Sequence, residues 1–128
     1  RSMAYINDEA FDGGLDYLDT NGTRIDITSQ EATTYSEATT AGTYSLGNKT
    51  GLNTGAPEAG ATDGRRVIVP AITDGSVTNT GTATHWALTD GSSILLATGP
   101  LSASQGVTAS NTFTLDAISI TIRDATAV

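Results

Sequence analysis

The sequence predicts an all-β fold, in which about eight short antiparallel strands form a sandwich or a partly open barrel, with one N-terminal α-helix. Apolar and polar residues alternate without a break over residues 118–122, which is the period of a half-buried strand. Turn-forming residues recur between short apolar runs. The predicted strands do not alternate with helices, which argues against the usual nucleotide-binding architectures. The 128 residues fit one domain, which we expect to span residues 4–128.

The N-terminal segment is the one convincing helix, over about residues 8–20. Phe11, Leu15 and Leu18 are spaced to form one apolar stripe. We expect Gly22 to end this helix in a left-handed conformation, because glycine adopts positive φ without a steric penalty.

The next segment changes from helical to alternating periodicity. Residues 24–28 predict a strand that turns Ile25 and Ile27 to one face and its charged side chains to the other. Residues 29–64 are rich in Thr, Gly, Ala and Ser, and predict extended strands joined by long loops. Residues 53–64 form the most loop-like part of this segment.

The second half of the chain carries clearer strand and turn signals. Residues 66–72 predict a strand in which Pro70 marks an edge or a bulge. Asp74-Gly75 predicts a turn, and residues 76–82 a strand of small residues. Asp90-Gly91 is the strongest hairpin signal. It joins two strands at residues 83–89 and 94–98, and three further strands are expected at 105–107, 112–115 and 118–122.

The composition argues against several partners. Fourteen acidic residues against six basic ones give a net charge of -8, which repels nucleic-acid phosphates. No apolar run reaches the length of a membrane span. Arg1-Ser2 resembles a cloning scar before a natural start at Met3, with no export signal. We therefore predict neither a nucleic-acid nor a membrane partner.

The residues offer little for catalysis. His85 is the one histidine, no nucleophile-elbow motif is present, and we expect His85 to be a surface or hydrogen-bonded structural residue. The helical acids Asp8, Asp12, Asp16 and Asp19 share one face, which we interpret as a solvated face, with a calcium site as the alternative. We predict no enzyme, no cofactor and no metal site.

Three residues are candidates for binding a partner protein: Trp86, Arg65 and Arg66. Trp86 on its strand is either a core anchor or, if exposed, part of a platform for sugars. The pair Arg65-Arg66 is either a strand-edge pair that discourages aggregation or a contact to an acidic surface. Lys49, the one lysine, is expected in a solvated turn.

Two parts of the chain resemble a known class of proteins. The first covers residues 5–18 (YINDEAFDGGLDYL) and 21–27 (NGTRIDI). The second covers residues 81–91 (GTATHWALTDG) and 95–101 (LLATGPL), followed by 107–115 (VTASNTFTL) and the alternating final strand at 118–122. Together they resemble small β-rich structural proteins of tailed bacteriophages and prophages, found among capsid decoration and tail-associated components. This resemblance lies in the texture of strands and turns and carries no chemical site.

The resemblance implies a virion structural protein, assembled in the bacterial cytoplasm, that decorates or stabilises the capsid through protein–protein contacts, as a possible homo-oligomer. The N-terminal helix or residues 53–64 would dock on capsid or tail proteins of the same particle. One alternative is a tail or fibre module that binds host glycan, which requires exposed aromatic side chains. Another is a hydrolase of cell-wall sugars, which requires two carboxylates roughly 5–10 Å apart.

Overall fold

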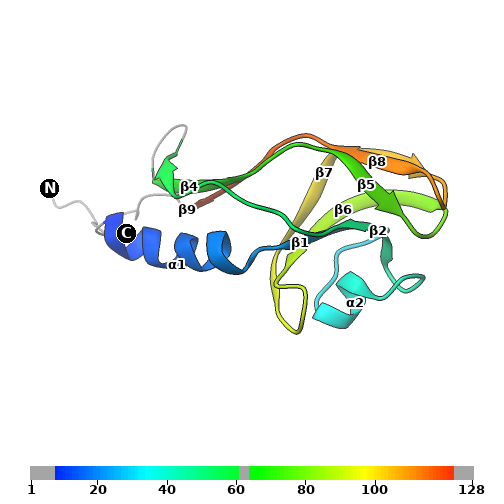
Figure 1. The fold of residues 1–128 in the computed structure, drawn as a ribbon, viewed down its shortest axis with the longest axis horizontal. Coiled ribbons are helices and arrows are strands. Elements are labelled where there is room, and N and C mark those ends of the chain that lie inside the picture. The colour runs from blue at the N-terminus through cyan, green and yellow to red at the C-terminus, as the bar shows by residue number, and fades with distance from the viewer. Residues whose placement is uncertain (1–7, 61–63, 123–128) are drawn as a thin grey trace, which may run out of the picture.

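The computed structural model describes residues 8–60 and 64–122, and it contains two antiparallel sheets and two helices (Figure 1). The elements follow the chain in this order: α1 (Asp8–Asn21), β1 (Arg24–Thr28), α2 (Tyr35–Thr39), β2 (Ser45–Lys49), β3 (Glu58–Ala59), β4 (Arg65–Val69), β5 (Ile72–Val77), β6 (Gly81–Thr89), β7 (Leu95–Val107), β8 (Thr112–Leu115) and β9 (Ile118–Ile122). The sequence-based expectation of an all-β fold with an N-terminal helix is confirmed.

The larger sheet has six strands in the order β7-β6-β1-β2-β5-β8, and every neighbouring pair is antiparallel. It curls into a partly open barrel around a core that includes Ile25, Ile27, Trp86, Leu88 and Phe113. The curl brings the two edge strands, β7 and β8, close together, and the short turn at residues 108–111 joins them.

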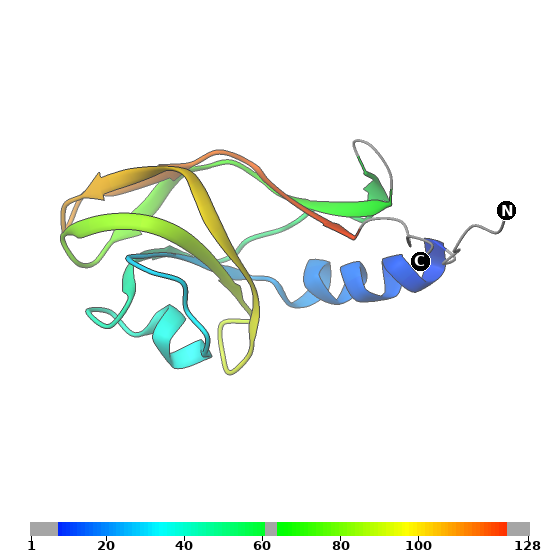
Figure 2. The same cartoon turned by 180° about the vertical axis from the view of Figure 1, so that it is seen from behind.

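The smaller sheet has the order β3-β4-β9 and extends away from the curled sheet (Figures 1 and 2). β4 leads directly into β5, and β8 leads directly into β9. The β4–β9 pair of the smaller sheet therefore continues as the β5–β8 pair of the larger sheet. Helix α1 lies along β4, with Leu15 fully buried. We call α1 together with β3, β4 and β9 the arm.

Helix α2 covers the outer face of the curled sheet. Ala32, Ala38 and Ala87 form a small apolar cluster there. As a result β1 is covered on both faces, and Asp26 is as fully buried as its neighbours Ile25 and Ile27. The sequence predicts the isoleucines on one face and the charged side chains on the other, and in the structure both faces are covered.

The structure also corrects the expectation of extended chain over residues 29–64, because α2 lies within it. Thr34 caps the helix and its Oγ1 accepts a hydrogen bond from the Glu37 amide at 3.1 Å. Glu37 Oε1 in turn accepts from the amide of Thr33 at 2.9 Å. Thr34 and Glu37 have the spacing of a capping box, a sequence signal that predicts a helix start.

Residues 66–82 are divided differently from the prediction. The strand breaks at Pro70, between β4 and β5, and Asp74-Gly75 lies inside β5 instead of forming a turn. This position of β5 requires a glycine because Phe113 packs against the backbone. A Cβ atom at Gly75 would lie 2.2 Å from Phe113 Cε2. Residues 78–80 form the turn, and the strand expected at 105–107 is the end of the long β7.

Helix α1 ends at Asn21, close to the expected boundary, but Gly22 does not have a positive φ. A Cβ atom at Gly22 would lie 2.6 Å from the Leu18 carbonyl oxygen and 3.1 Å from Leu88 Cδ2. Glycine is needed here for close packing of the helix end on the curled sheet, and the predicted left-handed cap is wrong. The hairpin at Asp90-Gly91 is confirmed, with Gly91 at φ 77°.

Candidate functional site

The strongest candidate for a binding site is an opening between the two edges of the curled sheet, which we call the seam. Its walls are residues 99–105 of β7 and residues 114–119 at the junction of β8 and β9, and Trp86 lies at its base. It encloses about 570 Å³, within the range of roughly 300–1,000 Å³ that is typical of ligand sites. The two walls meet near their shared turn and diverge away from it (Figure 2).

No ladder of backbone hydrogen bonds joins β7 to β8 or β9 in the described part of the chain. A single side chain spans the seam: Gln105 Nε2 donates to the carbonyl oxygen of Thr114 at 3.0 Å. This contact lies beside the turn, at the narrow end. The sheet therefore closes at one end only, and two strand edges face each other across the rest of the seam.

The β7 wall has an irregular backbone. His85 on β6 pairs with Pro100, and Ala83 pairs with Gln105, so Thr84 alone stands opposite four residues of β7 at 101–104. Such a bulge leaves backbone N–H and C=O groups outside the ladder. Residues 102–104 are exposed, so these groups are open to solvent or to a partner.

Trp86 and Gly99 shape the base of the seam. The indole of Trp86 is 9% exposed and belongs to the core of the curled sheet. Gly99 lies directly against it, since a Cβ atom there would be 2.7 Å from Trp86 Cζ2. Trp86 is thus a core anchor that lines the seam, and it is too buried to be an open platform for sugars. Tyr17 on α1, 48% exposed, is the one exposed large aromatic side chain in the described ranges.

Charge is sparse at the seam. Asp116 is the one ionisable residue among those that line it, and it is exposed. Within the described residues Asp116 makes no ion pair.

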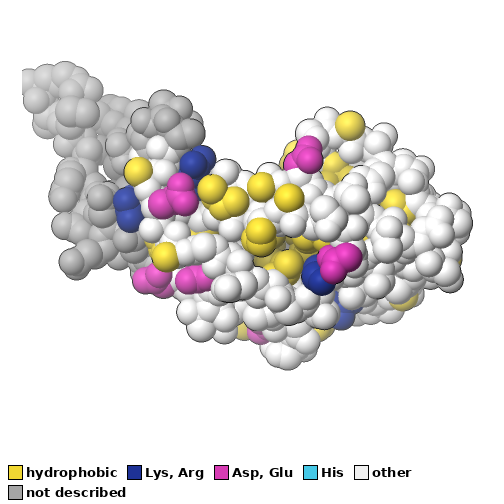
Figure 3. Space-filling model, turned by 45° about the horizontal axis from the view of Figure 1, so that its top comes forward, with side chains coloured by type: hydrophobic (Ala, Val, Ile, Leu, Met, Phe, Trp, Pro, Cys, Tyr) yellow, Lys and Arg dark blue, Asp and Glu magenta, His cyan; other side chains and the backbone are white. Residues whose placement is uncertain are grey.

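Hydrophobic side chains also reach the surface in the hollow between the arm and the curled sheet, on the face drawn in Figure 3.

Arg65 and Arg66 lie on β4 in the arm, in a different sheet from Trp86, so the structure does not bring the three candidates together. The Arg66 guanidinium pairs with Glu58 of β3 at 3.2 Å. Arg65 Nη2 donates to the Pro57 carbonyl oxygen at 3.4 Å. Both side chains are partly buried and tie β3 to β4, and their role in binding a partner stays a prediction.

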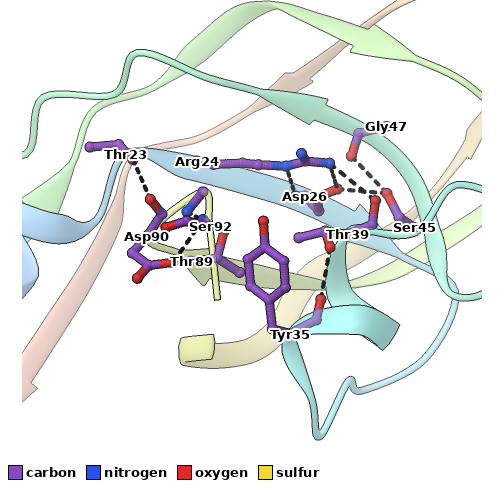
Figure 4. Close-up of polar contacts among 11 residues, drawn as sticks. Thr23, Arg24, Asp26, Tyr35, Thr39, Ser45, Gly47, Thr89, Asp90 and Ser92 are labelled. Carbon is purple, nitrogen blue, oxygen red and sulfur yellow. Dashed lines mark hydrogen bonds and ion pairs between the residues drawn. The ribbon is translucent and has the colours of Figure 1, made fainter. Parts of the chain in front are cut away.

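A polar cluster around the buried Asp26 and Ser45 lies beneath α2 (Figure 4). Arg24 donates to both carboxylate oxygens of Asp26, at 2.8 and 3.0 Å, and to the Thr39 carbonyl oxygen at 3.2 Å. Ser45 Oγ donates to Asp26 at 2.6 Å. Burial raises the pKa of the Asp26 carboxyl above its ordinary value, and the hydrogen bonds from Arg24 and Ser45 oppose this shift. The cluster links α2 to β1 and β2, and none of its residues lines the seam.

His85 has no catalytic partner among the described residues. Its Nδ1 lies 2.9 Å from Thr84 Oγ1, which itself donates to the Ser29 carbonyl oxygen. This is the hydrogen-bonded structural setting that we expected. Lys49, in contrast, lies in β2 and pairs with Asp74 at 3.0 Å, so the predicted turn is wrong.

The helical acids do not form a cluster in the part of the chain that is described. Asp16 is exposed, and Asp19 accepts a hydrogen bond from Thr54 at 2.9 Å. The side chains of Asp8 and Asp12 and the start at Arg1–Met3 lie outside the described residues. Within the described ranges, no three acidic or histidine side chains are placed to hold a metal ion, and no helix is long and apolar enough to cross a membrane.

Comparison of the chain with protein-family models, with curated proteins and with solved structures finds no match.

Sequence reasoning did not find the seam. It identified Trp86 but not the residues of β7, β8 and β9 that surround it.

Proposed function

We propose that this chain is a non-enzymatic structural protein of a tailed bacteriophage, which decorates or stabilises the capsid in the virion through protein–protein contacts. The observation that carries the binding part of this proposal is the seam, where two strand edges face each other without pairing. Unpaired edges are templates for pairing with another chain, and natural proteins usually block them. A protein that leaves them open is suited to assembly.

The arm supports the same proposal. It extends from the curled sheet, with α1 lying along β4 (Figure 1). An extended arm increases the surface that one small chain can present to neighbouring subunits, and a stable interface needs about 800 Å² from each partner.

The capsid as the partner rests on the resemblance to phage structural proteins stated above, which is carried by residues 5–18, 21–27, 81–91, 95–101, 107–115 and the strand at 118–122. The test is co-sedimentation with purified capsids of the phage or prophage that encodes the chain. We expect saturable binding with a fixed ratio of chain to capsid subunit. A chain that stays monomeric and remains in the supernatant at micromolar concentration would exclude the capsid role. Binding to a glycan array, lost on Tyr17→Ala, would instead favour the tail-module alternative.

A further inference from the structure

We propose that the seam binds an extended segment of a partner protein, which adds to the curled sheet as a strand between β7 and the β8–β9 junction and places a basic side chain near Asp116. This inference rests on the proposed function only in taking a protein as the partner. It adds the place of contact, the conformation of the bound segment and its charge.

Backbone groups on both walls provide the first argument. On one side, β7 is an edge strand that pairs with β6 alone, so its second edge faces the seam, and the bulge at residues 101–104 leaves further backbone groups outside the β6 ladder. On the other, β8 pairs with β5 and β9 pairs with β4, which leaves their second edges facing the seam. Gln105 occupies only the Thr114 carbonyl oxygen. An extended peptide offers N–H and C=O groups along both of its edges, so it can hydrogen-bond to the two walls together.

The dimensions and strand directions define the segment further. The wall formed by residues 114–119 is roughly 17–20 Å long at about 3.3 Å per residue, which matches five or six residues of extended chain. The six strands of the sheet alternate in direction, so β7 and β8 run antiparallel to each other. A strand inserted between them must be parallel to one wall and antiparallel to the other.

The small side chains around the seam favour a peptide backbone over a bulky ligand. Gly99, Ser102, Ala103, Ser104 and Ala117 line it, and the indole of Trp86 forms an apolar base. Short side chains allow the backbones to approach to strand-pairing distance. Proline is disfavoured in the bound segment because it lacks the N–H group that the walls require.

Charge decides between a partner protein and a second copy of this chain. Asp116 is the one charged group that lines the seam, and the whole chain carries a net charge of -8. Two copies repel each other, whereas a basic segment is attracted both by Asp116 and by the overall field. The occupant is therefore a basic segment of another protein.

The test begins with a random decapeptide library displayed on ribosomes and selected on the immobilised full chain. We expect enrichment of proline-poor peptides that alternate small or β-branched residues with at least one Lys or Arg. A selection that enriches no peptides, or only acidic or proline-rich ones, would contradict the proposal.

Two variants of the chain locate the binding. Ala103→Trp fills the seam, and we expect it to weaken the selected peptides at least tenfold, while Ala71→Trp, at an exposed alanine outside the seam, has no effect. Asp116→Lys should weaken the basic peptides at least fivefold, while the same charge reversal at exposed Asp16 on α1 changes affinity less than twofold. Far-UV circular dichroism melting checks that each variant is folded. Equal binding by Ala103→Trp and wild type would overturn the proposal.

Capsid binding by the same variants separates this inference from the proposed function. Peptide binding at the seam without capsid binding keeps the inference and excludes the capsid as the partner. Capsid binding that survives Ala103→Trp keeps the proposed function and excludes the seam. Amide shifts in an NMR titration with a selected peptide should fall on residues 101–104 and 114–119, and shifts confined to the arm would contradict strand addition.

Discussion

Two fully buried threonines on neighbouring strands differ in whether their hydroxyl groups are satisfied. Thr28 Oγ1 on β1 has no hydrogen-bond partner among the described residues, whereas Thr89 Oγ1 on β6 accepts from the Gly91 amide at 3.3 Å. A buried hydroxyl without a partner costs about 1–3 kcal/mol, because its hydration is lost and not replaced. We expect Thr28→Val to raise the free energy of unfolding by about 1 kcal/mol.

The matched substitution Thr89→Val removes a hydroxyl that does have a partner, so we expect it to lower the free energy of unfolding by about 1 kcal/mol. Urea denaturation at 25 °C, followed by far-UV circular dichroism, measures both changes. A Thr28→Val variant that is destabilised as much as Thr89→Val would mean that the Thr28 hydroxyl is satisfied in solution.

Gly75 lies inside strand β5, although the pair Asp74-Gly75 predicts a turn. The backbone of β5 lies under the ring of Phe113, which is 1% exposed, so there is no room for a side chain. Gly75→Ala should lower the free energy of unfolding by about 1–3 kcal/mol, the usual cost of overpacking a core. Gly55→Ala is the control, because a Cβ atom there meets nothing within 4 Å. Thermal melting of the two variants measures the difference, and equal melting temperatures would contradict the close packing.

At the scale of one element, the β6–β7 hairpin depends on the charge of Asp90. Its Oδ1 accepts hydrogen bonds from the amides of Ser92, Ser93 and Ile94 at 2.9, 2.8 and 3.0 Å. These bonds, led by the one from Ile94, lower the pKa of the Asp90 carboxyl below its ordinary value of 3.8. A lowered pKa means that the carboxylate stabilises the fold above the unfolded-state value, and that this contribution is lost as the pH falls through the folded-state value.

We therefore expect Asp90→Asn to be less stable than wild type at pH 7. The difference should shrink as the pH falls below about 4, where unfolded-state aspartate begins to take up a proton, and it should vanish below the folded-state pKa. Urea unfolding at a series of pH values from 7 to acid measures it. Asp16→Asn, at an exposed site on α1, controls for the change in net charge. A stability difference that stays constant with pH would contradict the role of the carboxylate.

Elements whose pattern is local were predicted well, and those set by packing were not. Strands β1, β8 and β9 and the hairpin at Asp90-Gly91 follow from alternation and turn residues. The division of residues 66–82 was wrong, because burial against Phe113 overrides the preference of Gly75 for turns. Helix α2 is only five residues long, and Thr34 and Glu37 were its sole clear signal.

At the scale of the whole molecule, the seam could not be predicted from the sequence. It depends on which strands fail to pair after the sheet has curled, and no local pattern of residues records this. Trp86 and Gly99 pair across the β6–β7 hairpin and form the base of the seam, but the position of β8 and β9 opposite them depends on how the whole sheet curls. The sparse charge and missing motifs could only favour binding over catalysis, without locating the binding surface.

The arm and the curled sheet share one core, which has a consequence for unfolding. Val69 of β4 and Ile72 of β5 belong to the same buried cluster, and Leu18 of α1 packs against it. Leu15 of α1 is fully buried within the arm, where α1 contacts β4. Leu15→Ala should lower the free energy of unfolding by about 2–5 kcal/mol, the usual cost of deleting a buried leucine side chain. Because the core is continuous, we expect Trp86 fluorescence in the curled sheet and far-UV circular dichroism to report one coincident unfolding transition, which the substitution shifts equally in both signals.

The control is Tyr17→Ala on the same helix, at a side chain 48% exposed, which should shift neither transition by much. If circular dichroism changes before the fluorescence of Trp86, then the arm unfolds separately from the curled sheet, and the two parts are independent units joined by β4–β5 and β8–β9.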